Sequence, residues 1–461
     1  MSYNISYIIL SILAAIISSI LAFFILRKRK DPFLCAFATM SIIFSYGLLE
    51  QQYSINTPLI ILILSHLFWI TFFILTLVIA RPLRPNQFDS FLFVLKTIPQ
   101  NILLYICLFW IFWKYFLFQR YGANVFAFTT DPDYLPQYEL WEELISTFLN
   151  FLLLGTFVTV IARYALGMKI PNFLNFLFVF NFLFYFFSGE SPIGARRLLF
   201  GLLFFWFSVI LIIKRPFHLI KKYILTITFV LFSFALAAFY QKVRGNVGNP
   251  TASQYLKSNN PVDFIKGFAL FLNPNLDVYS NQTKFFRSGP FDFFAKVVER
   301  VIDDKLSTKG ESILVSLKLS VPRRLYPGEK PKIDVDNILE WNLKVYPEFF
   351  SENYGIDYPT SLESIAFADA GIIGLLFIAT LFGLIFWITK IGIIKACKFP
   401  IIVLALLGIM ITLIAGKENS ATGIFASIRN FIFLIIVYMP VHLIYAWIKQ
   451  TVNIPIKNKS I

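Results

Sequence analysis

The chain has 461 residues, of which 57% are hydrophobic and only 15% are charged, and its mean hydropathy is +0.71. Because about a quarter of the residues in soluble proteins are charged, this composition excludes an ordinary soluble protein. The formal net charge of +15 would suit a nucleic-acid-binding protein, but the cations gather in alternate short loops between apolar stretches, which argues against that class.

Apolar stretches of roughly 18 to 25 residues recur along the chain, a length that matches the hydrocarbon core of a bilayer. They predict an all-α polytopic membrane protein with about eleven transmembrane helices. In chain order, the predicted spans are residues 5–26, 32–49, 57–80, 98–118, 143–162, 171–188, 198–213, 222–240, 363–388, 399–415 and 424–447. We expect one membrane domain, with the first eight spans in 1–240, a large external loop at 241–362, and the last three spans in 363–461.

Lysine and arginine residues gather in alternate loops between these spans, the bias that marks cytoplasmic loops. They are Arg27, Lys28, Arg29, Lys30, Arg81, Arg84, Lys96, Arg163, Lys169, Lys214, Arg215, Lys221, Lys222, Lys390, Lys395, Lys398, Lys449, Lys457 and Lys459. This pattern predicts an N-terminus outside the cell, a C-terminus in the cytoplasm, and loop 241–362 on the external side.

Neither the cysteines nor the histidines form a metal-binding pattern. The cysteines, which fall far apart in or beside predicted spans, are Cys35, Cys107 and Cys397. The histidines, none of which lies on the predicted external side, are His66, His218 and His442. We therefore expect neither a metal site nor a cofactor.

The external segment 241–362 contains two stretches that are expected to contact the membrane or the membrane domain. Residues 264–272 are apolar but too short to cross a bilayer, so we expect them in the interface or in a re-entrant turn. Residues 290–319 show helical spacing. Their apolar stripe is Phe291, Phe294, Val297, Val298 and Ile302. This stripe predicts an amphipathic helix that packs on the membrane domain.

The most informative part of this segment is a basic loop that is braced by prolines. Arg323 and Arg324 are bracketed by Pro322, Pro327 and Pro331. Prolines limit backbone freedom, which lowers the entropy lost when the arginines are held in place. We expect a rigid anion-binding loop in which one of the two arginines points into a site.

Other arginines also lie on the predicted external side. Arg196 and Arg197 lie at the head of the seventh span, and Arg429 lies about one and a half turns inside the last. Guanidinium groups match phosphate oxygens well, so a convergent set would bind a lipid-linked phosphate or pyrophosphate. Alternatively, Arg196 and Arg197 contact phospholipid headgroups, and Arg429 pairs with a carboxylate.

Carboxylates on the same side are candidate bases. Glu190 precedes the Arg196–Arg197 pair, Glu363 begins the ninth span, and Asp369 lies inside it. A charge within a span indicates a functional site or an interior cavity. Asp369 either partners an arginine or stays protonated, and the small residues Gly371 and Gly374 after it allow another helix to approach closely.

Three segments together resemble the O-antigen polymerase (Wzy-type) family of oligosaccharide repeat-unit polymerases. Segment 322–331, Pro-Arg-Arg-Leu-Tyr-Pro-Gly-Glu-Lys-Pro, is similar to the family's proline–arginine stretch in its large periplasmic loop. Segment 187–197 is similar to a Gly-x-Arg turn at the head of a span. Segment 359–374 resembles a loop-to-helix passage with an acidic residue and a Gly-x-x-Gly step. The hydropathy layout matches over the whole chain.

The resemblance implies an inverting, metal-independent glycosyltransferase of the GT-C type in the bacterial cytoplasmic membrane. Its substrate would be an undecaprenyl-pyrophosphate-linked glycan in a lipid membrane, with a polysaccharide chain-length regulator as an expected partner. It would polymerise repeat units of O-antigen, capsule or exopolysaccharide on the periplasmic side. The implied site residues are Arg196, Arg197, Arg323, Arg324 and Arg429 for pyrophosphate, Glu363, Asp369 or Glu190 for the acceptor proton, and Tyr326, Trp341 and Tyr358 for sugar faces. The aromatic residues are alternatively membrane-interface anchors.

Three other functions are weaker matches. Related O-antigen ligases carry a histidine ahead of the acidic helix, where this chain has Pro359 or Thr360. A lipid-linked oligosaccharide flippase would show a charged path to the cytoplasm and a repeat of its two halves, and neither is visible. A protein mannosyltransferase would carry paired acidic residues in the first external loop, where only Glu50 is found.

Overall fold

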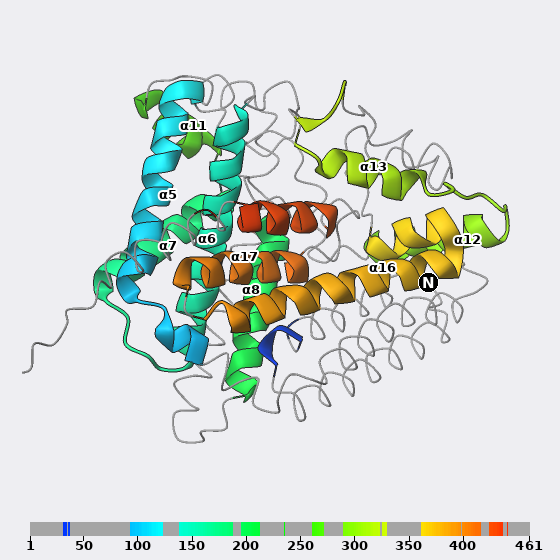
Figure 1. Ribbon diagram of the computed structural model, residues 1–461. Coiled ribbons are helices and arrows are strands. Elements are labelled where there is room, and N and C mark those ends of the chain that lie inside the picture. Colours follow the sequence, from blue (N-terminus) through cyan, green and yellow to red (C-terminus); the bar gives the residue numbers. More distant parts are fainter. Residues whose placement is uncertain are drawn as a thin grey trace, which may run out of the picture.

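The computed structural model (Figure 1) describes residues 31–34, 36, 93–122, 138–187, 195–212, 235, 261–271, 289–322, 325–329, 361–397, 399–415, 424–436 and 440. The regular secondary structure in these residues is helical, which confirms the all-α class for this part of the chain. The helices are α5 (Gln100–Tyr121), α6 (Leu140–Ala165), α7 (Asn172–Phe187), α8 (Ala195–Ile212), α11 (Pro261–Phe271), α12 (Gly289–Ile302), α13 (Glu311–Ser320), α16 (Leu362–Lys395), α17 (Pro400–Ala415) and a further helix, Ile424–Ile436.

Predicted spans coincide with helices wherever the structure describes them. Six predicted spans each match one helix: 98–118, 143–162, 171–188, 198–213, 363–388 and 399–415. The helix Ile424–Ile436 begins the last predicted span. The spans 5–26, 32–49, 57–80 and 222–240 lie outside the described residues, apart from residues 32–34, 36 and 235.

Three of the described helices, α5, α6 and α16, are long and apolar enough to cross a membrane. One face of α5 exposes Tyr105, Phe109, Phe112 and Phe116, at helical spacing. A row of large apolar side chains on the outside of a helix suits contact with acyl chains. The chain is therefore a helical membrane protein.

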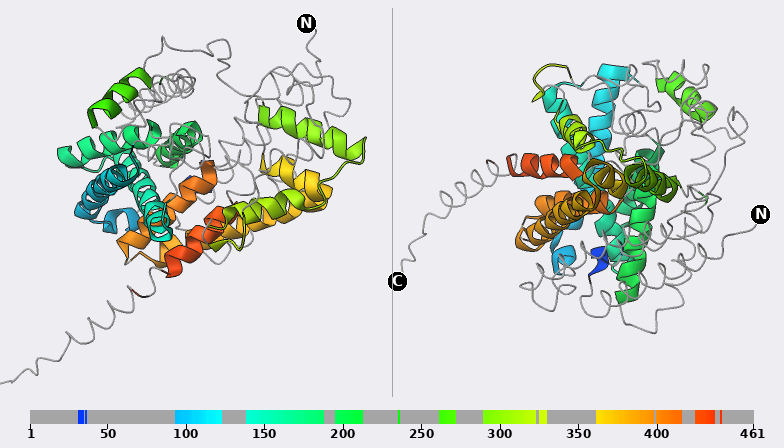
Figure 2. Two further views of the ribbon diagram at one scale, coloured as in Figure 1. Left: turned by 90° about the horizontal axis from the view of Figure 1, so that it is seen from above. Right: turned by 90° about the vertical axis from the view of Figure 1, so that its right-hand side faces the viewer.

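The helices form two groups that run in different directions. Figure 1 shows α5, α6 and α8 upright, with α16, α17 and the helix Ile424–Ile436 lying across them. Figure 2 shows the same crossing from two further sides, with α12 and α13 beside α16 and far from α5. The three helices that qualify as spans by length and composition thus do not share one direction.

The two groups meet where α6 crosses α17, at two glycines. A Cβ atom on Gly155 would lie 1.8 Å from the carbonyl oxygen of Leu404, and one on Gly408 would lie 2.1 Å from that of Phe151. Each glycine therefore faces the backbone of the other helix. Small residues permit such close approach, and van der Waals packing of this kind holds helices together in membranes.

We expect Gly155→Ala to destabilise the protein by about 1–3 kcal/mol, because the added methyl group would overlap a rigid backbone carbonyl. The measurement is the thermal unfolding midpoint of the purified protein in detergent. Gly392→Ala is the matched control, because its Cβ would meet the flexible side chain of Leu406, nearest at Cδ1 at 3.0 Å, instead of a backbone carbonyl group. Both changes raise helix propensity equally, so equal midpoints for the two variants would contradict the crossing described above.

Arg163 and Lys390, which were predicted in cytoplasmic loops, are buried inside helices, so their assignment to loops was wrong. Arg163 is buried in the last turn of α6 and donates to the carbonyl oxygens of Leu95, at 2.7 Å, and of Ile98. Lys390 is buried in α16 and forms an ion pair with Asp31. The reason is that both helices continue past the apolar windows that defined the spans.

The predicted amphipathic helix 290–319 is two helices, α12 and α13. The break between them contains Lys305, Lys309 and Gly310, all with positive φ. The predicted stripe is confirmed in part, since α12 packs against α16 with Phe294 edge-on to Phe367 at 6.1 Å between ring centroids. The segment predicted to lie in the interface, 264–272, corresponds to α11.

Candidate functional site

The N-terminal part of α16 contains a sharp bend that organises its surroundings. Ala370 (φ −148°, ψ 23°) and Gly371 (φ 58°, ψ −138°) leave the helical conformation. The positive φ of Gly371 favours glycine. A Cβ on Gly374 would lie 1.9 Å from the carbonyl oxygen of Ala366 in the same helix. The Gly-x-x-Gly step therefore permits the bend in α16, and Gly374 allows the helical backbone before the bend to approach the helix after it closely.

The bend frees backbone carbonyl groups, and the segment before α13 pairs with them. Thr308 N donates to the carbonyl oxygen of Ala368 at 3.0 Å. The hydroxyl of Ser307 lies 2.9 Å from the same oxygen and 3.2 Å from the carbonyl oxygen of Asp369. These contacts join the start of α13 to the bend of α16.

The carboxylate of Asp369 completes this junction. It accepts hydrogen bonds from the hydroxyl of Thr308, from Ser312 N at 3.2 Å and from Ile313 N at 2.7 Å. The two amides belong to the first turn of α13, whose N-cap Gly310 has no side chain to satisfy them. Asp369 thus caps α13 from a different helix, and its partners are amides and a hydroxyl group instead of an arginine.

Arg429, on the helix Ile424–Ile436, contacts the other end of α13. Its Nη1 donates to the carbonyl oxygen of Ser320, the last residue of α13, at 2.7 Å, and its Nε donates to Asn430 Oδ1 at 3.0 Å. Glu143, in the first turn of α6, is near enough to interact with Arg429 electrostatically. Arg429 is therefore a partly buried cation at the C-terminus of α13, where the helix dipole favours positive charge.

The proline–arginine loop begins directly after this contact. Leu325 N donates to the carbonyl oxygen of Pro322 at 3.0 Å, which closes a turn across the two residues between them. Those two residues are Arg323 and Arg324, which lie outside the described residues. Pro322 is buried and Leu325 is exposed. The chain therefore leaves α13 through a buried residue, Pro322.

Glu363 is the second residue of α16 and is only 4% exposed. A capping box between Ser361 and Ser364 begins the helix around it, with 2.9 Å from Ser361 N to Ser364 Oγ and 3.2 Å in the reverse direction. Among the described residues, Glu363 Oε2 has no hydrogen-bond partner. A buried carboxylate oxygen without a partner is rare and needs an explanation.

The other predicted site residues are described only in part. Tyr326 is half-buried in the segment after Leu325. The backbone of Arg196 and Arg197 lies in the first turn of α8, and their side chains are outside the described part. Glu190, Trp341 and Tyr358 also lie outside it. Among the residues that the structure describes, no cluster of His, Cys, Asp or Glu side chains could hold a metal ion.

A polar cluster between α5 and α6 was missed from the sequence. Glu142 is fully buried and accepts hydrogen bonds from Arg120 Nη1 at 2.6 Å and from the hydroxyl of Tyr121 at 2.5 Å. Lys114, buried in α5, lies over the ring of Trp110 at 5.6 Å from its centroid. The sequence feature that could have indicated this cluster is a lysine within an otherwise apolar span.

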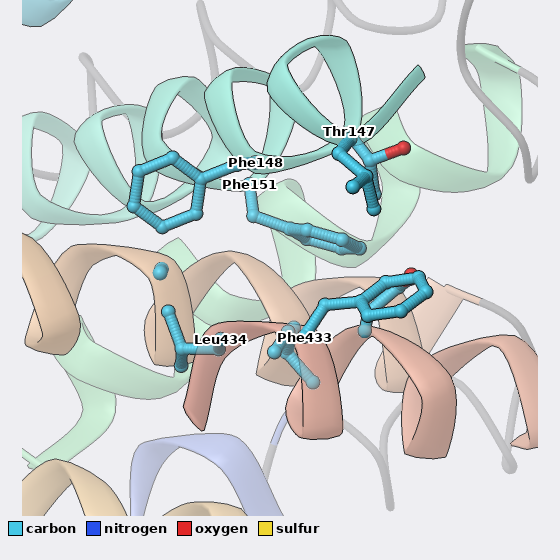
Figure 3. Close-up of a pocket in the computed structure, with 9 residues that line it drawn as sticks. Thr147, Phe148, Phe151, Phe433 and Leu434 are labelled. Atoms are coloured by element: carbon cyan, nitrogen blue, oxygen red, sulfur yellow. The ribbon is translucent and has the colours of Figure 1, made fainter. Parts of the chain in front are cut away.

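An apolar pocket lies beside Arg429 (Figure 3). Figure 3 shows Phe148 and Phe151 of α6 on one side and Phe433 and Leu434 of the helix Ile424–Ile436 on the other. Asn430, whose Oδ1 accepts a hydrogen bond from Arg429 Nε, also lines this pocket. A partly buried cation therefore adjoins an apolar hollow.

Comparison with known proteins gives no relative: no protein-family model matches the chain, and neither a curated protein nor a solved structure matches it. The resemblance to O-antigen polymerases therefore depends on the motifs and on the layout of the chain.

Proposed function

We propose that this protein is a polysaccharide polymerase of the bacterial cytoplasmic membrane, with about eleven spans, a GT-C-like fold and its active site on the external side. The growing glycan leaves its undecaprenyl pyrophosphate, and its anomeric carbon bonds to a hydroxyl oxygen of the acceptor repeat unit. The C–O bond to pyrophosphate breaks, the lipid pyrophosphate departs with the electron pair, and a carboxylate takes the hydroxyl proton.

The observation that carries this proposal is the contact between Arg429 and Ser320. It joins two of the segments that were selected from the sequence as cationic, because Ser320 lies two residues before Pro322. Arg429 therefore contacts the residue that stands three positions before Arg323 in the sequence. Such a pair of segments supports an anion site for a pyrophosphate with its developing charge.

The hollow lined by Phe148, Phe151 and Leu434 lies beside Asn430, the partner of Arg429, but it has room for about one water molecule and does not accommodate an isoprenoid chain. Tyr326 follows the arginine turn and is the described aromatic candidate for a sugar face.

Asp369 and Glu363 differ in how well each could act as a general base. Asp369 already accepts three hydrogen bonds. Glu363 has a carboxylate oxygen without a partner among the described residues. A general base needs a lone pair that can reach the acceptor hydroxyl, so Glu363 is the better candidate.

We expect Arg323→Ala and Arg324→Ala to lower the polymerisation rate, with about a 10²–10³-fold loss for the arginine that contacts the leaving pyrophosphate. The measurement is elongation of lipid-linked oligosaccharide by the purified protein in detergent, scored as a polysaccharide ladder. Elongation without a membrane gradient also separates a polymerase from a flippase.

Arg300→Ala is the matched control for these variants. Arg300 lies in the same predicted external segment, where it pairs with Asp304 at 2.7 Å with both side chains exposed. Exposed ion pairs contribute little to stability, so this variant is expected to make normal ladders. Full-length ladders from both Arg323→Ala and Arg324→Ala would overturn the proposal.

A further inference from the structure

We infer that an aromatic platform where α5 meets the start of α6 binds an uncharged sugar of the glycan substrate. The platform consists of Trp113 and Phe116 of α5 and Trp141 of α6. That the sugar belongs to a substrate depends on the proposed function, whereas sugar binding is measured without any polymerisation. The inference follows from how the three rings pack and from the polar groups at their edge.

The three rings pack on one another and leave two of them accessible. Trp113 and Phe116 stack with 5.3 Å between ring centroids, and Trp141 meets Trp113 edge-on at 5.8 Å. Trp113 is buried, whereas Phe116 and Trp141 are each 42% exposed. A buried indole thus supports two exposed rings, and an exposed ring face offers apolar surface to the C–H groups of a sugar.

Both indole N–H groups of the platform are used within the protein. Trp113 Nε1 donates to Ser146 Oγ at 2.8 Å, and Trp141 Nε1 donates to Glu139 Oε2 at 2.6 Å. A tryptophan that anchors a helix at the membrane interface presents its polar N–H edge to the headgroup region. Because Trp141 donates this group to Glu139, its exposed part is the ring. This favours a ligand that stacks on the ring over a lipid headgroup.

The polar groups beside Trp141 are held in place by one another. Arg120, in the last turn of α5, pairs with Glu139 and donates to the fully buried Glu142 at 2.6 Å. Glu142 Oε2 also accepts from Glu139 N at 2.8 Å, which fixes the start of α6. Since these side chains are ordered before a ligand arrives, binding costs little side-chain entropy.

The charges in this group favour hydroxyl groups over phosphate. Two carboxylates, those of Glu139 and Glu142, outweigh the one guanidinium group of Arg120, so a phosphate would be repelled. The side chain of Arg120 is nevertheless 40% exposed, and a guanidinium group has more N–H donors than these two pairs use. Its exposed part can therefore donate to the oxygen atoms of an uncharged sugar that lies on Trp141.

The first turn of α6 connects the platform with the candidate anion site. It contains Trp141 and also Glu143, which interacts electrostatically with Arg429. Residues two positions apart on a helix point to different sides, so the platform and Arg429 flank this turn. The width of a helix with its side chains is about 10 Å. A glycan with its pyrophosphate at Arg429 would thus extend its sugars toward the platform.

The test is binding of the lipid-free repeat-unit oligosaccharide, which mild acid releases without its pyrophosphate from the lipid-linked oligosaccharide of the native cells. Its Kd for the purified full-length protein in detergent is measured by saturation-transfer NMR. We expect Trp141→Ala and Trp141→Leu to weaken binding by about tenfold, because both lose the ring face. Trp141→Phe keeps a ring face and is expected to stay within about threefold of the original Kd.

Phe109→Ala is the matched control. Phe109 is 55% exposed and lies about two turns from Phe116 on α5, so its loss should leave the Kd unchanged. Failure of the original protein to bind the oligosaccharide would overturn the inference, and so would an unchanged Kd in Trp141→Ala. Binding by Trp141→Leu that equals the original would make the ring a membrane-interface anchor and reject the sugar site.

Polymerisation kinetics separate this inference from the proposed function. We expect Trp141→Ala to raise KM for lipid-linked oligosaccharide by about tenfold with little change in kcat, because the platform binds sugar remote from the reacting bond. A protein that binds the oligosaccharide through Trp141 but never elongates it would keep the platform and reject the polymerase. Elongation combined with an unchanged Kd in Trp141→Ala would do the reverse.

Discussion

Replacing Glu363 with glutamine is expected to lower the rate of repeat-unit polymerisation by about 10²–10⁴-fold, the usual contribution of a general base. Glutamine has nearly the same volume, so the buried site at the start of α16 stays filled. It cannot accept the proton of the acceptor hydroxyl, however. The measurement is the initial elongation rate of the purified protein with lipid-linked oligosaccharide.

Glu329→Gln is the matched control, because Glu329 is exposed beside the arginine turn and carries the same change of charge. We expect that variant to keep its rate. A normal rate in Glu363→Gln would remove Glu363 from the mechanism. Equal losses in both variants would show that charge near the turn matters more than proton transfer.

Replacing Lys390 with methionine is expected to lower the free energy of unfolding by about 3–5 kcal/mol, because Asp31 would remain buried without its countercharge. The side chains of Lys390 and Asp31 are 11% and 2% exposed, so water cannot replace the lost partner. The measurement is the thermal unfolding midpoint in detergent.

The double variant Asp31→Asn, Lys390→Met tests the cause. Asparagine removes the stranded charge yet can still accept hydrogen bonds from Phe33 N and Leu34 N, which lie 3.1 and 3.2 Å from Asp31 Oδ1. We expect the midpoint to return most of the way to its original value. A double variant that is less stable than Lys390→Met would argue against an unpaired charge as the cause.

The positions of the helices were largely predictable, because a long apolar run has few alternatives to a helix in a membrane. Their ends were less so. In the sequence, Arg163 and Lys390 mark the ends of apolar stretches. Both helices nevertheless continue past them, because buried partners satisfy these cations. The break between α12 and α13 was also missed, since Lys305 and Lys309 are unusual at positive φ.

The residue types of the candidate site were predictable from the sequence, but the roles of those residues were less predictable. Arg429 and Asp369 stood out because charges are rare in apolar spans. Their partners did not, because Asp369 caps a helix that begins 58 residues earlier and Arg429 binds a backbone carbonyl group. Every residue presents a backbone carbonyl group and every residue except proline presents an amide, so no sequence pattern marks them. Only the fold brings them together.

The glycine crossing of α6 and α17 has a consequence for how the two groups of helices move. With backbone touching backbone at Gly155 and Gly408, no layer of side chains is left to shear, so the two helices travel as a single rigid frame. Relative movement of the described helices must then take place outside this frame, and the interruption of α16 at Gly371 lies there.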